Sequence, residues 1–501
     1  MKPQTAWFSR LTDSRLAIGF ILVVATILRG MGIATREIQY DDAFSILLSE
    51  QSFTKIASGA AADTMPPLYF WLLHVWMQIS HQIWFLRALT VLLNLLTVYI
   101  FYRLAALLFD RRSAFWAALI AAVVPIQLYH AQDIRMYALL LLAQTCYAYC
   151  FVRVWRSAEQ GLPNRWNWAG LILAGGVAMY SHNIAIFGLI APDLFLLLRK
   201  KWKLLGQLIA AQLGIGLLAI PWLIQIPAQF AKVQRAWSLS RPGILELVQA
   251  IIQFTGALPL PTVLTVIVAV LSLWAFCLVT LETIRAVRRN EAVLLAACFA
   301  VLSPVLLFIA SYIMQPIFIP RAFLLSGLMY YALVGWLIAR SWPRGASILV
   351  AGAFLLAAGL SLPSFYAFNQ FPRSPFAQSV RYLETVIQPG DVIVHDNKLS
   401  YFPAELYSRT LPQGFLADEP GSPNDTLSPV SAQVMGTFPV ASLESAIAGK
   451  QRVYYVVFER TIQEYQSLGA ADHPNLTWLA DHYSQVDRRQ FGDLDVYSFE
   501  N

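Results

Sequence analysis

Two adjacent carboxylates, Asp41 and Asp42, stand a few residues beyond the first apolar run of the chain. A carboxylate beside an acceptor hydroxyl can remove its proton as a general base, and a carboxylate pair can also bind a divalent cation. The alternative is a solvated loop without chemistry. We favour a functional site over a solvated loop, because the pair precedes a short apolar and aromatic stretch that is typical of an interfacial helix.

Two arginines, Arg135 and Arg321, each lie between two apolar runs rather than within a long polar loop. A guanidinium group can hold a phosphate through paired, charge-assisted hydrogen bonds. The alternative for either residue is a basic side chain that reaches toward lipid headgroups. Arg135 and Arg321 are therefore the candidate phosphate ligands.

Three further polar residues are candidates for a substrate cavity near these arginines. His130 and Asp133 precede Arg135 in one short segment, so the sequence predicts them at the same level. His182 begins a short turn between two apolar runs, where a turn-forming Asn183 beside an incidental histidine is the alternative. A His395-Asp396-Asn397 run also looks catalytic, but no Ser or Cys nucleophile motif lies nearby.

The composition shows what kind of scaffold must position these residues. Of the 501 residues, 57% are hydrophobic and only 13% are charged, and the mean hydropathy is +0.56. These values exclude a soluble globule and place most of the chain in lipid. The net charge of +7 comes from short basic clusters between apolar runs, which indicates membrane topology and not nucleic-acid binding.

Apolar runs near the spanning length of about 20 residues occur about eleven times. They lie near 16–35, 87–108, 113–130, 136–152, 167–181, 184–198, 204–226, 260–284, 291–313, 322–339 and 346–362. The sequence therefore predicts an all-α polytopic membrane protein of about eleven transmembrane helices.

Basic clusters after alternate runs predict the orientation of these helices. They comprise Lys2, Arg10 and Arg15; Arg103, Arg111 and Arg112; Arg153, Arg156 and Arg165; Arg199, Lys200, Lys201 and Lys203; Arg285, Arg288 and Arg289; and Arg340 and Arg344. Positive charge is normally retained on the cytoplasmic side. We therefore expect the cytoplasmic (inner) membrane, a cytoplasmic N-terminus and an extracytoplasmic or periplasmic C-terminus.

Cations predicted on the outer face need a separate explanation. They are Arg29, Arg36, Lys55, Arg87, Arg135, Lys232, Arg235, Arg241 and Arg321. One predicted outer loop is both basic and aromatic, with Lys232, Arg235, Trp237 and Arg241. This loop either closes over a lipid-linked acceptor or is an ordinary solvated loop.

Two predicted outer segments are longer than simple turns. Loop 36–86 contains Pro66-Pro67 before an aromatic apolar stretch too short to span, which predicts interfacial helices. Residues 363–501 alternate strand-like and helix-like runs, which predicts a soluble extracytoplasmic α/β domain. The expected division is thus a catalytic membrane domain, 1–362, which includes loop 36–86, followed by the soluble domain.

Four motifs in the first half resemble bacterial GT-C glycosyltransferases of the protein O-mannosyltransferase and lipid A aminoarabinose transferase type, a family 39-like group. They are Tyr40-Asp41-Asp42-Ala43-Phe44-Ser45, Met65-Pro66-Pro67-Leu68-Tyr69, Leu86-Arg87-Ala88-Leu89 and Gln132-Asp133-Ile134-Arg135-Met136-Tyr137-Ala138-Leu139. The likeness covers roughly residues 15–200. The Arg-Met-Tyr-Ala-Leu stretch is its most specific element, and it adds Tyr137 to the candidate cavity residues.

The chain departs from that family at three points. The acidic pair is usually Asp-Glu, whereas here the second residue is Asp42. Met65 stands where the family often has Lys or His, and after Arg321 the aromatic residue is shifted by one position, to Phe323. The chain also lacks the Trp-Trp-Asp-Tyr-Gly signature of oligosaccharyltransferases.

The resemblance implies a membrane enzyme that moves a sugar from a polyprenyl-phosphate-linked donor to an acceptor hydroxyl, with inversion. Asp41 matches the family's catalytic base, and Asp42 is its neighbour at the catalytic position. The acceptor is a lipid, a glycan or a protein, and no nucleic acid is expected as a partner. The chemistry requires no cofactor or metal, although a carboxylate pair such as Asp41 and Asp42 can also bind a divalent cation.

Two other classes of protein are alternatives to this enzyme. A lipid or glycan transporter or flippase should carry ionisable residues along a path through the membrane. The predicted spans are nearly free of them, and Asp193 is the chief exception. A membrane-anchored binding module would leave the acidic pair and the arginines without a role.

Overall fold

A computed structural model describes residues 16–501 except 234–238, 342–344 and 423. The described chain forms two compact units. We call residues up to 33, 64–233 and 239–367 the membrane unit, and residues 34–63 with 368–501 the sheet unit. The segment 34–63, which was expected to belong with the membrane helices, therefore groups with the C-terminal residues instead.

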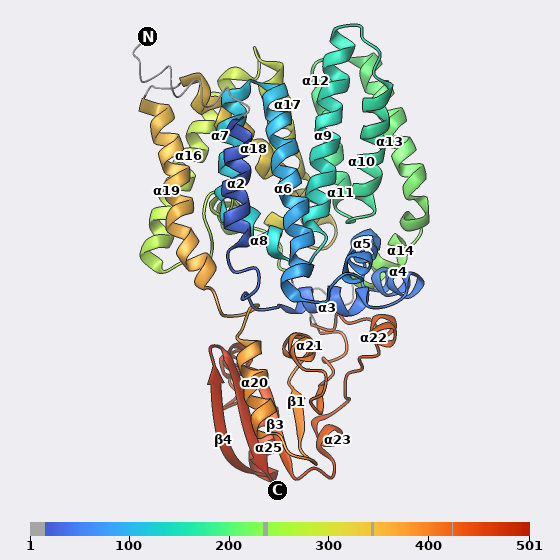
Figure 1. The fold of residues 1–501 in the computed structure, drawn as a ribbon, viewed down its shortest axis with the longest axis vertical. Helices are drawn as coiled ribbons and strands as arrows, with labels where there is room; N and C mark the ends of the chain where they lie inside the picture. Colours follow the sequence, from blue (N-terminus) through green and yellow to red (C-terminus); the bar gives the residue numbers. More distant parts are fainter. Residues whose placement is uncertain (1–15, 234–238, 342–344, 423) are drawn as a thin grey trace. The chain divides into compact units, whose positions relative to one another are not determined.

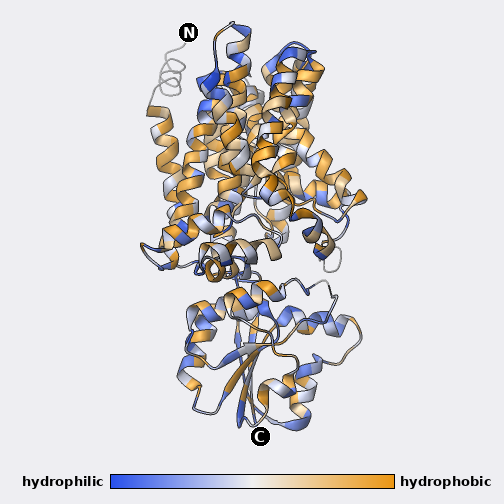
Figure 2. Cartoon of the chain, turned by 90° about the vertical axis from the view of Figure 1, so that its right-hand side faces the viewer, coloured by the Kyte–Doolittle hydropathy of each residue, from blue (hydrophilic) through white to orange (hydrophobic). Residues whose placement is uncertain are grey.

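The membrane unit is entirely helical in its described part (Figure 1). Its helices are α2 (Leu16–Gly30), α5 (Leu68–Met77), α6 (Ile83–Leu108), α7 (Arg111–Val123), α8 (Pro125–Gln132), α9 (Tyr137–Glu159), α10 (Arg165–Met179), α11 (Ala185–Leu189), α12 (Ala191–Leu198), α13 (Trp202–Leu223), α14 (Ile226–Val233), α15 (Ile244–Gln253), α16 (Thr262–Ala286), α17 (Glu291–Ile313), the 3-10 helix η1 (Pro320–Phe323), α18 (Leu324–Ser341) and α19 (Gly345–Ala367). Figure 2 shows that hydrophobic residues predominate along these helices.

Within the described residues, seven helices are long and apolar enough to cross a membrane, or eight if the bent pair α7 and α8 is one span. The seven include α6, α9, α13, α16 and α17, together with the last two helices of the unit. The runs predicted near 16–35 and 184–198 appear as shorter apolar helices. A multi-pass membrane protein is confirmed, and the count of eleven stays a prediction. The aromatic stretch after Pro67 is helical, as expected.

The bend of 60° between α7 and α8 occurs at Val124 and Pro125. Proline disfavours helical backbone in the preceding residue, so α7 ends there with unsatisfied carbonyl groups. The fully buried Arg29 donates hydrogen bonds to the carbonyl oxygens of Ala122 (2.9 Å) and Ala121 (3.3 Å). This arginine therefore stabilises the end of α7, which explains one of the cations that had been predicted on the outer face.

Helix α18 packs unusually closely on α7. A Cβ atom on Gly335 would lie 2.4 Å from the carbonyl oxygen of Ser113, so only glycine permits this approach. Most residues of the span 320–341 are buried inside the protein. Because η1 leads directly into this fixed helix, Arg321 has a rigid support.

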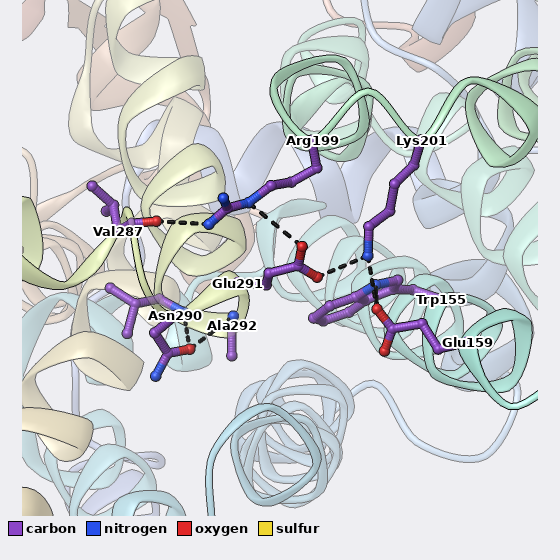
Figure 3. A network of polar contacts seen from close by, with 9 residues as sticks. Trp155, Glu159, Arg199, Lys201, Val287, Asn290, Glu291 and Ala292 are labelled. Carbon is purple, nitrogen blue, oxygen red and sulfur yellow. Dashed lines mark hydrogen bonds and ion pairs between the residues drawn. The ribbon is translucent and has the colours of Figure 1, made fainter.

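An ion-pair cluster joins three helices at the end of α9 that lies away from Tyr137 (Figure 3). The Nζ atom of Lys201 lies 2.7 Å from a carboxylate oxygen of Glu159 and 2.7 Å from one of Glu291. Arg199 lies 3.6 Å from Glu291 and donates a hydrogen bond to the carbonyl of Val287. Opposite charges thus connect the end of α9 with the starts of α13 and α17.

The sheet unit contains a five-stranded mixed sheet in the order β2-β1-β3-β5-β4. Its elements are α3 (Tyr40–Ser49), α4 (Phe53–Ala62), α20 (Phe376–Val386), β1 (Val392–His395), α21 (Lys398–Tyr407), β2 (Gln413–Phe415), α22 (Pro429–Met435), α23 (Leu443–Ile447), β3 (Arg452–Phe458), α24 (Glu459–Ser467), α25 (Pro474–His482), β4 (Ser484–Phe491) and β5 (Leu494–Glu500). β1 pairs in parallel with β2 and β3, and β5 pairs antiparallel with β3 and β4.

Alternating residues of β3 build a core on each face of the sheet. Val453, Tyr455 and Val457 pack with the apolar residues of α23, α24 and α25. Tyr454 and Val456 pack with those of α20 and α21 on the other face. This period of two is what an interior strand covered by helices on both sides requires, and it confirms the predicted C-terminal α/β domain.

Candidate functional site

The end of α8, the link that follows it and the start of α9 together carry four of the predicted site residues. His130 lies in the last turn of α8, and Asp133 is the residue that ends that helix. The Nδ1–H group of His130 donates to the Asp133 carboxylate at 3.1 Å, and both residues are buried. Arg135 is buried in the link itself, and Tyr137 begins α9.

The Tyr137 ring is the meeting point of residues from three separate segments. Its centre lies 5.2 Å from the ring of His130 and 5.7 Å from the ring of His182. The guanidinium carbon of Arg321 lies 5.6 Å from the same ring centre, within the range of a cation–π contact. Tyr137 therefore brings the α8–α9 link, the turn after α10 and η1 together.

The pKa of His182 depends on its burial and on the charges around it. Burial, together with the nearby charges of Arg135 and Arg321, lowers the pKa of His182 to about 3. The imidazole is therefore neutral at physiological pH. Its Nδ1 atom accepts a hydrogen bond from the backbone N–H of Ile184 at 3.2 Å. The single ring proton must then lie on Nε2, which makes His182 a hydrogen-bond donor and not a base.

Asn183 fixes the turn that carries His182. Its amide nitrogen donates to the carbonyl oxygen of Thr64 at 2.9 Å and to the side-chain oxygen of Gln229 at 3.1 Å. Its amide oxygen accepts from the indole N–H of Trp222 at 2.7 Å. Asn183 is thus an anchor for three segments and more than a simple turn former. Sequence reasoning missed this role, because neither Trp222 nor Gln229 stands near Asn183 in the chain.

Aromatic packing positions Arg321. Phe323, two residues further along η1, lies 5.6 Å from Phe254 and 5.1 Å from Phe318, measured between ring centres. Phe254 also fills the space above Gly327, where an added Cβ atom would lie 2.2 Å from the Phe254 ring. Phe323 is the aromatic residue that departs from the family pattern, and here it fixes the helix turn that presents Arg321.

The membrane unit therefore gathers all of the predicted site residues that belong to it. We call this set the arginine–histidine cluster: His130, Asp133, Arg135, Tyr137, His182 and Arg321. Arg87, another predicted outer cation, instead donates to the carbonyl oxygen of Ile33 at 3.1 Å and is fully buried. Arg235 and Trp237 of the predicted basic loop lie outside the described residues.

Asp41 and Asp42 belong to the sheet unit, in the first turn of α3 after the N-cap Gln39. The free N–H groups of a first helical turn favour negative charge there. Asp42 is fully buried, whereas Asp41 is partly exposed, so the two consecutive side chains have different surroundings. In the described part of the chain, no group of three or more His, Cys, Asp or Glu residues is arranged to hold a metal ion.

The His395-Asp396-Asn397 run forms an internal network of the sheet unit. His395 contacts Ser400 and Gln413 at 3.2 Å each, and burial lowers its pKa to about 4. Asp396 accepts a hydrogen bond from the Tyr455 hydroxyl at 2.5 Å and lies 3.2 Å from Nε2 of His473. These partners satisfy the polar groups inside the domain, so the run has a structural explanation.

Comparisons with known proteins concern the family and the fold of the chain. Residues 64–225 match the family described as dolichyl-phosphate-mannose-protein mannosyltransferase. Among curated proteins, no sequence matches the chain. The matched range includes Arg135, Tyr137 and His182, but neither Asp41 nor Arg321.

Two solved structures are similar to nearly the whole chain. The crystal structure of ArnT from Cupriavidus metallidurans bound to undecaprenyl phosphate has a TM-score of 0.62 at 14% identity, and the match covers 96% of this chain and 97% of that one. The Archaeoglobus fulgidus oligosaccharyltransferase in its apo form has a TM-score of 0.55 at 13% identity, covering 98% and 75%.

A third structure is that of the archaeal oligosaccharyltransferase AglB from Archaeoglobus fulgidus, in complex with an inhibitory peptide and a dolichol-phosphate. Its TM-score is 0.52 at 12% identity, covering 96% of this chain and 73% of that one. Together the comparisons confirm the GT-C fold, support a membrane glycosyltransferase of the type that the sequence resembles, and give no support to the flippase alternative.

Proposed function

We propose that the protein transfers a sugar from a polyprenyl-phosphate-linked donor to an acceptor hydroxyl, with inversion, on the outer face of the cytoplasmic membrane. The observation that carries this proposal is the arginine–histidine cluster. Arg321 and His182 both contact the Tyr137 ring, and the charges of Arg135 and Arg321 add to burial in lowering the pKa of His182. A buried positive region at the end of membrane helices suits the single negative charge of a lipid phosphodiester.

The cluster supplies what departure of a polyprenyl phosphate requires. The leaving group needs stabilisation of the charge that develops on its phosphate oxygens. The guanidinium groups of Arg135 and Arg321 supply charged donors, and the Nε2–H group of His182 supplies a neutral one. Asn183 fixes the turn that carries His182, and the Tyr137 ring contacts Arg321, so these two groups need little reorganisation when the lipid-linked sugar reacts.

Proton removal from the acceptor is assigned to Asp41, by its match to the family's catalytic base. Asp41 is partly exposed, whereas the buried Asp42 is suited to orienting the first turn of α3. In the reaction, the acceptor oxygen bonds to the anomeric carbon, the bond from that carbon to the phosphate oxygen breaks, and Asp41 takes the hydroxyl proton. A single displacement of this kind inverts the anomeric centre. A divalent cation at the acidic pair remains an open part of the proposal.

The solved structures support the class of donor. One of them holds undecaprenyl phosphate and another holds a dolichol-phosphate, and both share the fold of this chain. We propose the same class of polyprenyl phosphate for the donor here, with a lipid, a glycan or a protein as acceptor. The cytoplasmic location of the N-terminus and the outer location of residues 368–501 are part of the proposal.

The direct test incubates the purified protein with undecaprenyl phosphates that carry radiolabelled hexoses or pentoses, in the presence of a cell-envelope extract. We expect release of undecaprenyl phosphate and labelling of an envelope component, because a transporter or a binding module would leave the donor intact. Transfer to water alone would contradict the acceptor part of the proposal, and an intact donor in every mixture would contradict the enzyme.

The same assay separates the two carboxylates. Asp41→Asn keeps the size of the side chain but cannot take the proton, so transfer should fall by about 10²–10⁴-fold while donor binding survives. Asp42→Asn should cost less, since an amide can still orient a neighbouring group. A dead Asp42 variant beside a nearly normal Asp41 variant would assign the base to Asp42 instead.

A further inference from the structure

We infer that the C-terminal part of the sheet unit positions the catalytic helix, with Phe402, Tyr407 and Arg409 as positioning residues that hold the start, middle and end of α3. We call these three residues the α3 clamp. The inference rests on the proposed function, because it takes Asp41 on α3 as the base. It gives residues 368–501 a role in catalysis without any contact to substrate.

The start of α3 is held by Tyr407, the last residue of α21. The Tyr407 hydroxyl donates a hydrogen bond to the carboxylate of Glu37 at 2.8 Å and accepts one from the backbone N–H of Ile38 at 3.3 Å. The same Glu37 carboxylate accepts from the backbone N–H of Ala377 at 3.2 Å. The chain is therefore fixed immediately before Asp41, at a point where the backbone enters the helix.

The middle of α3 is held by the ring of Phe402, which is fully buried. Phe402 meets Tyr40 edge-on with ring centres 5.1 Å apart and stacks on Phe44 with centres 6.4 Å apart. Tyr40 and Phe44 are one helical turn apart, so both lie on one face of α3. Packing of that face against Phe402 fixes the rotation of the helix about its axis, and with it the direction of Asp41.

The end of α3 is held by Arg409. Its two terminal nitrogen atoms donate to the two carboxylate oxygens of Glu50 at 3.0 and 2.6 Å, and Glu50 is the residue that ends the helix. A bidentate pair restricts both position and orientation. Ser431 adds a hydrogen bond to the carbonyl oxygen of Gly59 at 3.0 Å, which holds the following helix α4 to α22.

The physical reason for such a clamp is the shortness of α3. A helix of 10 residues is marginal on its own, and its stability must come from tertiary packing. A general base must also lie within hydrogen-bond reach of the proton that it removes, and a misplacement of about 1 Å can cost about 100-fold in rate. The clamp contacts therefore matter for the rate more than for the stability of the domain.

The test compares two matched double variants of the full-length protein. Tyr407→Phe with Arg409→Gln opens the clamp while leaving its apolar packing intact. Tyr454→Phe with Arg488→Gln is the control, because it removes a hydroxyl hydrogen bond to Val386 and a bidentate arginine pair with Asp495 elsewhere in the same unit. The exposed fractions of Arg409 and Arg488 are similar, at 50% and 47%.

Two measurements are made on each variant. The first is release of undecaprenyl phosphate from the labelled donors, separated into kcat and donor KM. The second is amide hydrogen exchange in residues 40–50 and in β3. We expect the clamp variant to lose about 10-fold or more in kcat, to keep its donor KM, and to exchange faster in α3 but not in β3. The control should match wild type in kcat and in α3 exchange.

Exchanging the charges of the Arg409–Glu50 pair provides a further test. Arg409→Glu alone should reduce kcat, and adding Glu50→Arg should restore much of it, because the pair is then re-formed with its partners exchanged. A clamp variant with normal kcat would overturn the positioning role, whether or not α3 exchanges faster. A wild-type protein that releases no undecaprenyl phosphate would overturn the proposed function and the inference together, whereas the exchange data would still report the clamp contacts.

Discussion

The two ends of α9 show two opposite uses of charge in one membrane unit. At one end, the ion-pair cluster sets Lys201 between Glu159 and Glu291, and the charges compensate one another (Figure 3). At the other end, burial lowers the pKa of His182, the charges of Arg135 and Arg321 lower it further, and the imidazole is neutral. About 34 Å of helix separates the two ends of α9, at 1.5 Å per residue.

The difference indicates what each cluster is for. Opposite charges that satisfy one another lower the energy of the folded protein and leave little for a ligand to add. Two cations beside a buried neutral histidine place positive charge where an anion can bind. The first arrangement joins helices, whereas we propose the second as a binding site for the donor phosphate.

The largest effect that tests this comparison concerns the side of the membrane. A reporter enzyme that is active only outside the cytoplasm should be active when fused after Ala367 and inactive when fused after Lys200, beside the ion-pair cluster. A cytoplasmic reporter should give the reverse pattern. Equal activity at both sites would contradict the assignment of the two clusters to opposite faces.

The second effect concerns donor affinity. Arg135→Ala or Arg321→Ala should weaken binding of an undecaprenyl-phosphate sugar by about 10- to 150-fold, because a charge-assisted hydrogen bond contributes about 1.5–3 kcal/mol. Equilibrium binding in detergent or nanodiscs measures the change, and thermal unfolding checks that each variant is folded. Unchanged affinity in both variants would return these arginines to the lipid-headgroup explanation.

The third effect concerns the ion-pair cluster, where a substitution should change stability but not donor affinity. Lys201→Met should lower the free energy of unfolding by about 1 kcal/mol or less, because its ion pairs are partly exposed to solvent, and it should leave donor affinity unchanged. Thermal unfolding and the same binding assay provide both numbers. A loss of donor affinity in this variant would show that the two ends are coupled.

The smallest effect is that of pH on donor affinity, which should stay nearly constant. The pKa of His182 lies at about 3, below its ordinary value near 6.5, so its protonation state does not change between pH 8 and pH 5. Donor affinity should then vary by no more than about twofold over this range. Affinity that rises steeply below pH 6.5 would show that a charged His182 binds the phosphate.

The same depressed pKa has a consequence for stability. Below pH 6.5 the unfolded chain gains a proton at His182 that the folded protein does not take up, so the free energy of unfolding should fall as the pH is lowered toward 3. The His182→Asn variant should lose less stability than wild type over that interval. An equal loss in both would assign the acid sensitivity to other groups.

The proximity of some candidate site residues follows directly from their place along the chain. Arg135, Tyr137 and His130 lie within one short segment, so their proximity follows from the chain itself. Arg321 meets Tyr137 only because η1 and α18 pack beside α7, and no residue spacing encodes that approach. The sequence also did not indicate that the apolar run near 184–198 divides into two short helices, α11 and α12.

The grouping of α3 with the C-terminal residues could not be read from the sequence for a similar reason. Phe44 and its apolar neighbours on α3 suit a membrane surface as well as a protein core, so hydrophobicity alone does not distinguish the two. The partner of this face is Phe402, more than 300 residues later in the chain. Arg29 and Arg87 donate to backbone carbonyl groups inside the protein. The sequence alone does not distinguish such an arginine from one at the membrane surface.

The distance in sequence between α3 and its partners also determines when the enzyme becomes competent during its synthesis. The acidic pair is among the first parts of the chain to be made, whereas β5, which pairs with β3 beside the centre of the sheet, ends at Glu500. Contacts between such distant segments form late, because the whole intervening chain must be present first. A chain that stops before β5 lacks part of the sheet that supports α3. With Asp41 as the proposed base, such an incomplete chain should not act on the donor lipid.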